Sequence, residues 1–381
     1  MFGRKRIFGT AGLAVIAAVM LAACGGGAEA QTSGAGNATA QAAGTQAAGG
    51  QSTGAENTAA AGSTGKAAEG GAGTQLHIVT TIFPAYDWVR EISGNADNVD
   101  ITMLLGNGTD MHSYQPSVAD IMKIADCDLF IYTGGESEAW VKDAIANAKN
   151  PDMEVLSLMD TLGDRAKEEE ILEGMQAEEE HEGHTGEHAE EHDHEDTEEP
   201  EYDEHVWLSL KNAEICVGEI AARLSELDPE DTDTWSANAA AYTEKLKDLD
   251  GRFRAAADSA PLKTVIFGDR YPFRYLLDDY GLSCYAAFPG CSAETEASFE
   301  TIVFLAGKAD ELGTGAILTI ENSDGKIART ITENTKTKDQ EILVMNSMQS
   351  VTDADAAAGT TYLGIMEENL RVLGKALGSD T

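Results

Sequence analysis

The chain is poor in basic residues and in cysteine. Against 66 Asp and Glu it has only 26 Lys and Arg, so its formal net charge is −40 over 381 residues. This balance argues against a nucleic-acid partner, which requires positive charge, and favours cations. Five cysteines are present, of which four follow Cys24. Four thiols in so long a chain do not make a disulfide scaffold.

The chain also lacks the sequence signatures of common hydrolases and nucleotide-binding enzymes. It contains no His-Glu-x-x-His pairing and no phosphate-binding loop, and its Gly-x-Ser-x-Gly string at Gly50–Gly54 lies in a stretch without predicted strands or helices, so it is not the strand–turn–helix elbow of a hydrolase. A zinc hydrolase needs an open coordination position and a general base, which the first of these motifs most often supplies. We therefore expect a protein that is not an enzyme.

The first apolar run, Ile7–Ala23, follows Arg4, Lys5 and Arg6 and is shorter than the ~20 residues that span a bilayer. It predicts a secretory signal. Small residues before Cys24 and a glycine after it resemble the lipobox of bacterial lipoproteins, which predicts lipid attachment at Cys24; a plain signal peptide is the alternative. The Gly-, Ala-, Ser- and Thr-rich stretch 25–74 has no apolar periodicity and predicts a disordered tether.

What the chain does have is histidine placed among carboxylates. Imidazole is the commonest ligand for divalent transition metals, and His112 and His205 each close a short segment suited to a metal ligand. Between them lies an acidic stretch at about 164–204 with five more histidines: His181, His184, His188, His192 and His194. We expect this loop to capture metal weakly; a merely solvated acidic loop is the alternative.

Strand and helix patterns alternate along the body of the chain, which indicates parallel sheets. The predicted strands are 78–83, 101–105, 129–132, 264–267, 283–288, 316–320 and 341–345. The predicted helices are 85–93, 118–125, 139–148, 213–227, 236–257, 273–280, 297–312, 326–335 and 362–377. The fold class is therefore α/β, with two lobes, each a mainly parallel sheet flanked by helices, joined by one long helix.

This pattern divides the chain into a series of predicted segments. They are a signal peptide at 1–24, the tether at 25–74, a first α/β lobe with the acidic loop at 75–232, a linking helix at 233–260 and a second α/β lobe at 261–381. Two such lobes leave a cleft at the carboxyl ends of their strands.

Three segments resemble one protein family over about residues 76–378. Thr80-Thr81-Ile82-Phe83-Pro84, Asp110-Met111-His112-Ser113-Tyr114-Gln115-Pro116-Ser117 and Asp203-Glu204-His205-Val206-Trp207-Leu208 are similar to the zinc- and manganese-binding lipoproteins of bacterial ABC importers. The resemblance implies a monomeric receptor on the outer face of the cytoplasmic membrane, anchored by lipid. Such a receptor binds metal between its lobes and delivers it to a permease and its ATPase.

The ligand pattern of that family is only half present. His112 and His205 match two ligands of the first lobe. In the second lobe the family has His or Glu where this chain has Gly268, and often Asp where it has Asn346. Glycine has no side chain to coordinate a metal, and an amide oxygen is a weak donor for zinc.

A zinc site prefers four ligands, so replacements are expected near predicted strand ends. Cys291 ranks first, Asp269 second and Glu321 third. A thiolate would favour Zn²⁺ over Mn²⁺ because sulfur is a soft ligand. Alternatively, Cys291 pairs with Cys284 in a disulfide or is a small buried residue, and Asp269 belongs to a structural ion network.

The sequence therefore predicts an extracytoplasmic Zn²⁺ receptor of an ABC importer. A receptor for Mn²⁺ or another divalent metal, and a surface metal buffer or adhesin not coupled to transport, are the alternatives. Because both imidazoles must be unprotonated to bind metal, affinity is expected to fall as the pH drops through roughly 6–6.5.

Overall fold

The computed structural model describes residues 75–94, 96–176, 201–292 and 296–379. The predicted signal peptide with Cys24, the tether and the five loop histidines lie outside these ranges. Within them, no helix combines the length and apolar character needed to cross a membrane.

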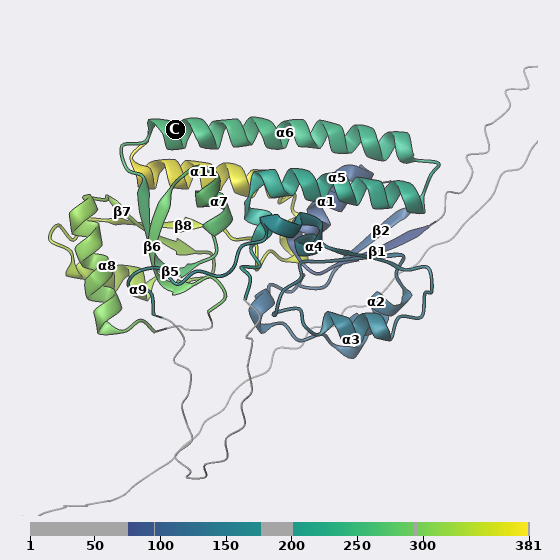
Figure 1. The fold of residues 1–381 in the computed structure, drawn as a ribbon, viewed down its shortest axis with the longest axis horizontal. Helices are drawn as coiled ribbons and strands as arrows, with labels where there is room; N and C mark the ends of the chain where they lie inside the picture. The colour runs from purple at the N-terminus through teal and green to yellow at the C-terminus, as the bar shows by residue number, and fades with distance from the viewer. Residues whose placement is uncertain (1–74, 95, 177–200, 293–295, 380–381) are drawn as a thin grey trace, which may run out of the picture. The chain divides into compact units, whose positions relative to one another are not determined.

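The first lobe is built on a parallel sheet with the strand order β2-β1-β3-β4 (Figure 1). Its strands are β1 (Leu76–Thr80), β2 (Val99–Met103), β3 (Leu129–Tyr132) and β4 (Glu154–Ser157). β1 pairs with β2 on one side and β3 on the other. The carboxyl ends of β1 and β3 therefore flank a switch point, where open α/β sheets bind ligands.

The second lobe repeats this arrangement with the order β6-β5-β7-β8. Its strands are β5 (Thr264–Tyr271), β6 (Ser283–Pro289), β7 (Ala316–Ile320) and β8 (Glu341–Met345). The pairing of β5 with β6 shifts register between Phe267 and Arg270. The predicted fold class, two parallel sheets flanked by helices, is confirmed.

The helices of the first lobe surround its sheet. They are α1 (Phe83–Ser93), η1 (Met111–Ser113), α2 (Val118–Asp126), α3 (Val141–Ala146), α4 (Leu158–Leu162), η2 (Gly163–Arg165), η3 (Val206–Leu208) and α5 (Leu210–Leu227). The remaining helices are α6 (Thr232–Ser259), α7 (Arg274–Asp279), α8 (Phe299–Leu312), α9 (Lys326–Asn334), α10 (Asp353–Ala357) and α11 (Tyr362–Leu377).

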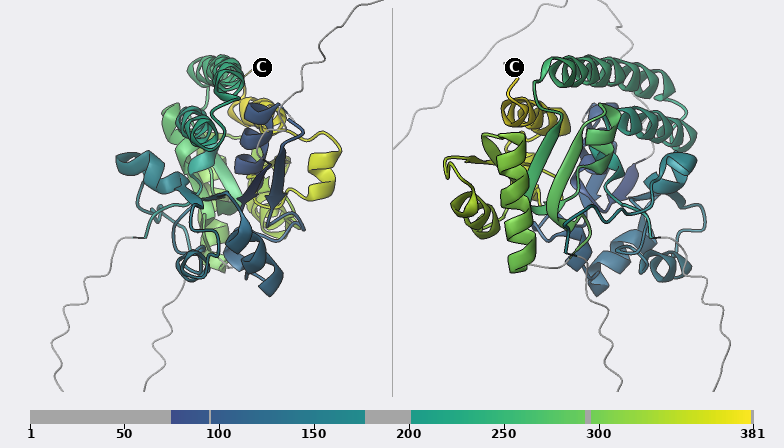
Figure 2. Two further views of the ribbon diagram at one scale, coloured as in Figure 1. Left: turned by 90° about the vertical axis from the view of Figure 1, so that its right-hand side faces the viewer. Right: turned by 60° about the vertical axis from the view of Figure 1, so that its left-hand side comes forward.

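Helix α6 runs past both sheets, with α5 and α11 beside it (Figures 1 and 2). One stripe of α6 is buried, as the helical spacing in the sequence indicates: Trp235, Ala239, Tyr242, Leu246, Leu249 and Phe253. This stripe belongs to an apolar core that contains side chains from both sheets. A shared core favours two lobes that move little against each other.

Polar contacts reinforce this seam between the lobes. The Trp207 indole nitrogen donates to the carbonyl of Ser347 at 2.8 Å, and the Tyr362 hydroxyl donates to the carbonyl of Trp207 at 2.7 Å. All three residues are fully buried. Because Trp207 follows His205 by two residues, these two hydrogen bonds attach the segment that carries His205 to the second lobe.

The structure also differs from the sequence-based prediction in a few elements. β4, α4 and α10 were not predicted. A helix of five residues, such as α4 or α10, completes too few turns to establish a helical period. The strand predicted at 264–267 continues to Tyr271. Gly268, Asp269 and Arg270 therefore belong to β5 rather than to a loop beyond it.

Candidate metal centre

His112 is held by a short turn at the start of the cleft. Asp110 caps the 3₁₀ helix η1, and its Oδ1 accepts the backbone N–H of His112 at 3.1 Å. The Nδ1 of His112 lies 2.8 Å from the hydroxyl of Ser137 and 3.7 Å from a carboxylate oxygen of Glu204. These partners occupy Nδ1 and leave Nε2 facing the opposite way.

His205 is fully buried and oriented by a carboxylate two residues before it. The Oδ1 of Asp203 accepts the His205 backbone N–H at 2.9 Å and lies 2.8 Å from Nδ1. A carboxylate at Nδ1 places the proton there and leaves the lone pair on Nε2, which is the arrangement of metal-binding histidines.

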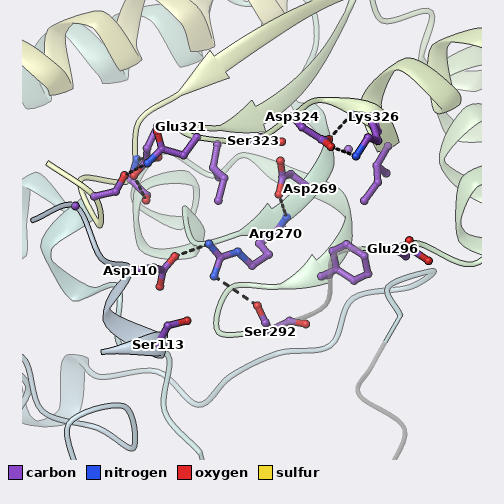
Figure 3. Close-up of a pocket in the computed structure, with 18 residues that line it drawn as sticks. Asp110, Ser113, Asp269, Arg270, Ser292, Glu296, Glu321, Ser323, Asp324 and Lys326 are labelled. Carbon is purple, nitrogen blue, oxygen red and sulfur yellow. Dashed lines mark hydrogen bonds and ion pairs between the residues drawn. The ribbon is translucent and has the colours of Figure 1, made fainter. Parts of the chain in front are cut away.

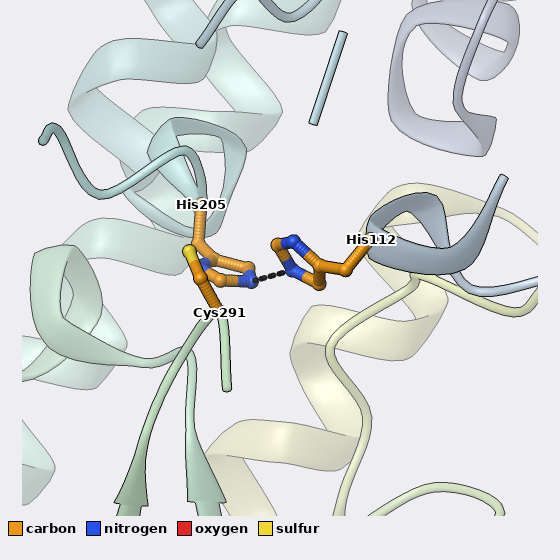
Figure 4. A group of neighbouring side chains, drawn as sticks. All are labelled: His112, His205 and Cys291. Carbon is orange, nitrogen blue, oxygen red and sulfur yellow. Dashed lines mark hydrogen bonds between the residues drawn. The ribbon is translucent and has the colours of Figure 1, made fainter. Parts of the chain in front are cut away.

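The two rings meet at the site and Cys291 joins them. The Nε2 atoms of His112 and His205 lie 3.2 Å apart, and one donor atom from each histidine and the Sγ of Cys291 all lie within 4.8 Å of one another (Figure 4). Cys291 follows β6, so the second lobe contributes this atom. In the described part of the chain, this is the one group of three His, Cys, Asp or Glu side chains so placed.

A glycine permits this close approach. A Cβ added to Gly290 would lie 2.9 Å from the carbonyl oxygen of Tyr271 and 3.0 Å from the Cε1 of His205. Such distances are shorter than ordinary carbon contacts, so a larger residue would displace the loop that carries Cys291. The Gly290–Cys291 pair thus brings a thiol against an imidazole.

The surroundings keep the imidazole of His112 neutral and the thiol of Cys291 protonated. Burial, together with the neighbouring His205, lowers the pKa of His112 to about 3. Burial, with the charge of Glu169 nearby, raises the pKa of the Cys291 thiol far above its usual value. The low pKa moves the protonation of His112 below pH 6–6.5, the range in which its protonation was expected to weaken binding. A bound metal must instead displace the thiol proton.

Two of the predicted ligands lie outside the three-residue group. Asp269 and Glu321 line a neighbouring cavity of about 630 Å³ (Figure 3). One oxygen of Asp269 accepts the N–H of Arg270 at 2.9 Å. The carboxylate of Glu321 accepts the N–H and the hydroxyl of Ser347, both at 2.7 Å, and the N–H of Gln349 at 3.2 Å. Glu321 thus fixes the loop after β8.

The two positions where the family pattern is broken also have structural explanations. A Cβ at Gly268 would lie 2.6 Å from the Cα of Ala328, because helix α9 packs directly on this part of β5. Asn346 accepts the N–H of Met348 at 2.8 Å, and its own N–H donates to Asn369 at 2.8 Å. Gly268 has no donor atom in a side chain, and the amide oxygen of Asn346 is engaged by the N–H of Met348.

The disulfide alternative is wrong. The four cysteines in the described residues are free, and Cys127, Cys216 and Cys284 are buried. Cys284 is the second residue of β6 and Cys291 lies two residues beyond its other end, so most of the strand separates them. Asp203, Glu204 and Ser137 were not predicted to orient the histidines; the Asp-Glu-His triplet was a usable signal, whereas Ser137 is distant in sequence.

Comparison with known proteins identifies the family. The sequence matches the family described as zinc-uptake complex component A, periplasmic, over residues 78–376. The chain belongs to this family. The family resemblance stated from the sequence is therefore confirmed.

Relatives and solved structures agree with this assignment. The zinc-binding lipoprotein AdcA of Streptococcus pneumoniae is 33% identical over 312 residues, which cover 82% of this chain and 57% of that protein. The high-affinity zinc uptake system protein ZnuA of Bacillus subtilis is 31% identical, with 83% of this chain and 92% of that protein covered. The structure of the Zn(II)-bound ZnuA-like domain of S. pneumoniae AdcA superimposes with a TM-score of 0.60 at 28% identity, covering 80% of this chain and 99% of that domain.

Proposed function

We propose that this chain is the receptor of an ABC-type zinc importer rather than an enzyme. It would capture Zn²⁺ in the interlobe cleft and deliver it to a membrane permease driven by an ATPase. The observation that carries the proposal is the convergence of His112, His205 and Cys291 from two lobes onto one point. Membership of a zinc-uptake family supports the same conclusion.

The proposed ligand set favours zinc over manganese. Two neutral imidazoles and one thiolate provide three of the four ligands of a tetrahedral zinc site, and the fourth position stays exchangeable. Thiolate is a soft donor that suits Zn²⁺, whereas Mn²⁺ prefers oxygen. An exchangeable position suits cargo that must later be released.

We propose that the acidic loop feeds this site. Its two flanks pair as a short antiparallel ribbon: Glu168 bridges Tyr202, and the N–H of Glu169 donates to the carbonyl of Glu201 at 2.8 Å. One strand of the ribbon leads directly into Asp203 and His205. The carboxylate of Glu169 accepts the N–H of Cys291 at 3.3 Å. Metal gathered by the loop histidines would therefore be delivered beside the thiol.

The predicted signal peptide and tether indicate where the protein would be located in the cell. Signal cleavage before Cys24 and acylation of its thiol would tether the receptor to the outer face of the cytoplasmic membrane. A permease that pulls on the lobes would then distort the three-ligand site and release Zn²⁺.

X-ray absorption at the zinc edge tests the ligand set directly. Residues 177–200 are removed so that the loop histidines contribute nothing, and the ribbon is retained because it carries Glu169 and Asp203. One equivalent of Zn²⁺ should show one sulfur at about 2.3 Å and two imidazoles. A shell of nitrogen and oxygen alone would contradict Cys291 as a ligand and favour a manganese receptor. A metal buffer or adhesin would bind Zn²⁺ equally but fail to support uptake in cells with an intact permease.

A further inference from the structure

Arg270 lies between the two loops that carry His112 and Cys291. Its Nη2 pairs with the Oδ2 of Asp110 at 2.6 Å, and its Nη1 donates to the carbonyl of Ser292 at 3.5 Å (Figure 3). Asp110 precedes His112 by two residues, and Ser292 follows Cys291 directly. One guanidinium thus contacts the neighbours of one proposed ligand from each lobe.

Through Asp110, Arg270 is linked to the turn that carries His112. While the Oδ2 of Asp110 pairs with Arg270, its Oδ1 accepts the backbone N–H of His112 at 3.1 Å. The path from the second lobe to the His112 main chain therefore passes through one carboxylate. The pair is largely shielded, with the side chains of Arg270 and Asp110 18% and 26% exposed.

The backbone of Arg270 is held in the sheet of the second lobe. It lies in β5 just beyond the register shift and pairs with Phe288 of β6, and its N–H donates to the side chain of Asp269. Helix α9 closes over Gly268, two residues before it. At the point of β5 where a second-lobe ligand is absent, the chain therefore places a cation that reaches across the cleft.

We propose that Arg270 is a positioning and specificity-determining residue, which takes over the organising role of the absent second-lobe ligands. It fixes the spacing of His112 and Cys291 before metal arrives. It also keeps the Asp110 carboxylate engaged, so that this oxygen donor stays out of the metal site and the ligand set remains selective for Zn²⁺. This inference rests on the proposed metal site.

The chemistry of arginine suits both tasks. A planar guanidinium offers several donors in fixed directions, so it can bond a carboxylate and a carbonyl at the same time, whereas a lysine ammonium is a single point charge. Without Arg270, the Asp110 carboxylate is free to turn toward a cation bound at His112. An added oxygen ligand would favour Mn²⁺ relative to Zn²⁺.

The test uses the full chain and the variants Arg270→Gln, Arg270→Lys and Asp110→Asn. Lys326→Gln is the matched control, because Lys326 lines the same cavity but pairs with Asp324 instead of Asp110. Zn²⁺ and Mn²⁺ affinities are measured by competition with chelators strong enough to strip the loop, and zinc-edge absorption reports the ligands. Thermal unfolding confirms that each variant is folded.

Arg270→Gln should weaken Zn²⁺ binding by about 10- to 100-fold, the range found when a residue that orients a metal ligand is lost. The ratio of Mn²⁺ to Zn²⁺ affinity should rise, with added oxygen at the zinc edge. Arg270→Lys should recover part of the loss, and Lys326→Gln should behave as wild type. Adding Asp110→Asn to Arg270→Gln should restore the metal ratio, because the competing carboxylate is gone.

Wild-type Zn²⁺ affinity and metal ratio in Arg270→Gln would overturn the inference. The inference would also be overturned if the losses of Zn²⁺ binding free energy in Arg270→Gln and Asp110→Asn add up in the double variant. Residues that act through one contact are coupled, so their losses should not be additive. If Arg270→Gln does not fold, Arg270→Lys and Asp110→Asn, alone and combined, give the same coupling test. His112→Ala distinguishes failure of this inference from failure of the proposed metal site. If His112→Ala loses Zn²⁺ binding and Arg270→Gln does not, only the inference about Arg270 is refuted. If His112→Ala retains Zn²⁺ binding, the metal site itself is refuted.

Discussion

The two lobes have the same sheet topology but contribute to the centre in different ways. The first lobe supplies both imidazoles and the side chains that orient them, Asp203, Glu204 and Ser137. The second supplies one thiol and one guanidinium. In the first lobe, His205 is oriented by the nearby Asp203, whereas His112 is oriented by Ser137 and Glu204 from elsewhere in the same lobe. The contribution of the second lobe depends instead on how β5 and β6 end.

The largest expected effect comes from removing an imidazole of the first lobe. His112→Ala should weaken zinc binding by more than about 100-fold, since the loss of an orienting partner alone reaches 10- to 100-fold. His77→Ala is the matched control, because that histidine is exposed and lies beside Asp100. Chelator competition measures both affinities. Equal affinities in the two variants would remove the first lobe from the metal site.

The second lobe is tested through its thiol and the pH dependence. Because burial raises the pKa of the Cys291 thiol far above its usual value, Zn²⁺ bound by Cys291 as proposed would release one proton from the thiol. The affinity should therefore rise by about tenfold per pH unit between about pH 6 and 8. His112, whose pKa is lowered to about 3, adds nothing in this range.

Cys291→Ser should bind Zn²⁺ more weakly and lose this slope. Cys127→Ala, which removes a thiol at the amino end of β3, should keep both the affinity and the slope. Titrations at several pH values with proton release followed in weak buffer provide the measurement. A slope that survives in Cys291→Ser would assign the released proton to another group.

The orienting carboxylate of the first lobe should have the next effect. Asp203→Asn leaves the size unchanged but removes the charge that holds the proton on Nδ1 of His205. Zinc affinity should fall by about 10- to 100-fold. Asp100→Asn, beside the exposed His77, should leave affinity unchanged. An unaltered affinity in Asp203→Asn would show that burial alone orients the ring.

The first lobe also buries Glu138, which directly follows Ser137. Its carboxylate accepts the N–H of Gly134 at 2.8 Å. Burial raises the pKa of Glu138 from 4.5 to about 7. Between about pH 4.5 and 7, Glu138 is therefore protonated in the folded protein but ionised in the unfolded chain. The stabilisation from this proton is fully present below about pH 4.5 and is lost as the pH rises through about 7.

Glu138→Gln mimics the protonated form and should raise the free energy of unfolding at pH 8 by up to about 3 kcal/mol. The difference from wild type should shrink on acidification and vanish below about pH 4.5. Urea unfolding at both pH values measures it, and zinc affinity serves as the control that the site is intact. A gain that is independent of pH would exclude ionisation of Glu138 as its cause.

The smallest expected effect concerns the acidic loop. Removing residues 177–200 should leave the affinity of the tight site unchanged within about twofold, because the three proposed ligands, His112, His205 and Cys291, all lie outside the deleted residues. Several weak zinc equivalents should disappear in calorimetry. Loss of the tight site instead would place one of its ligands in the loop.

Much of this could be predicted from the sequence where the signal is local. The motif around His112 and the Asp-Glu-His triplet predicted both imidazoles, and strand and helix periods predicted both sheets except for β4. Asp269 and Glu321, ranked second and third as ligands, lie outside the group of His112, His205 and Cys291. A position after a strand fixes only the sheet edge, not the direction of the side chain. Asp269 lies at the register shift of β5, and Glu321 is engaged by Ser347 and Gln349 in the loop after β8.

The sequence by itself determined the fold class, the family and the two histidines, because these depend on periodicity and on short motifs. Only the tertiary structure decided which second-lobe residue reaches them. The thiol of Cys291 arrives at His205 because Gly290 allows close packing, and Arg270 reaches Asp110 because β5 continues past its bulge. Those contacts join residues more than 85 positions apart in sequence, where no local pattern carries the information.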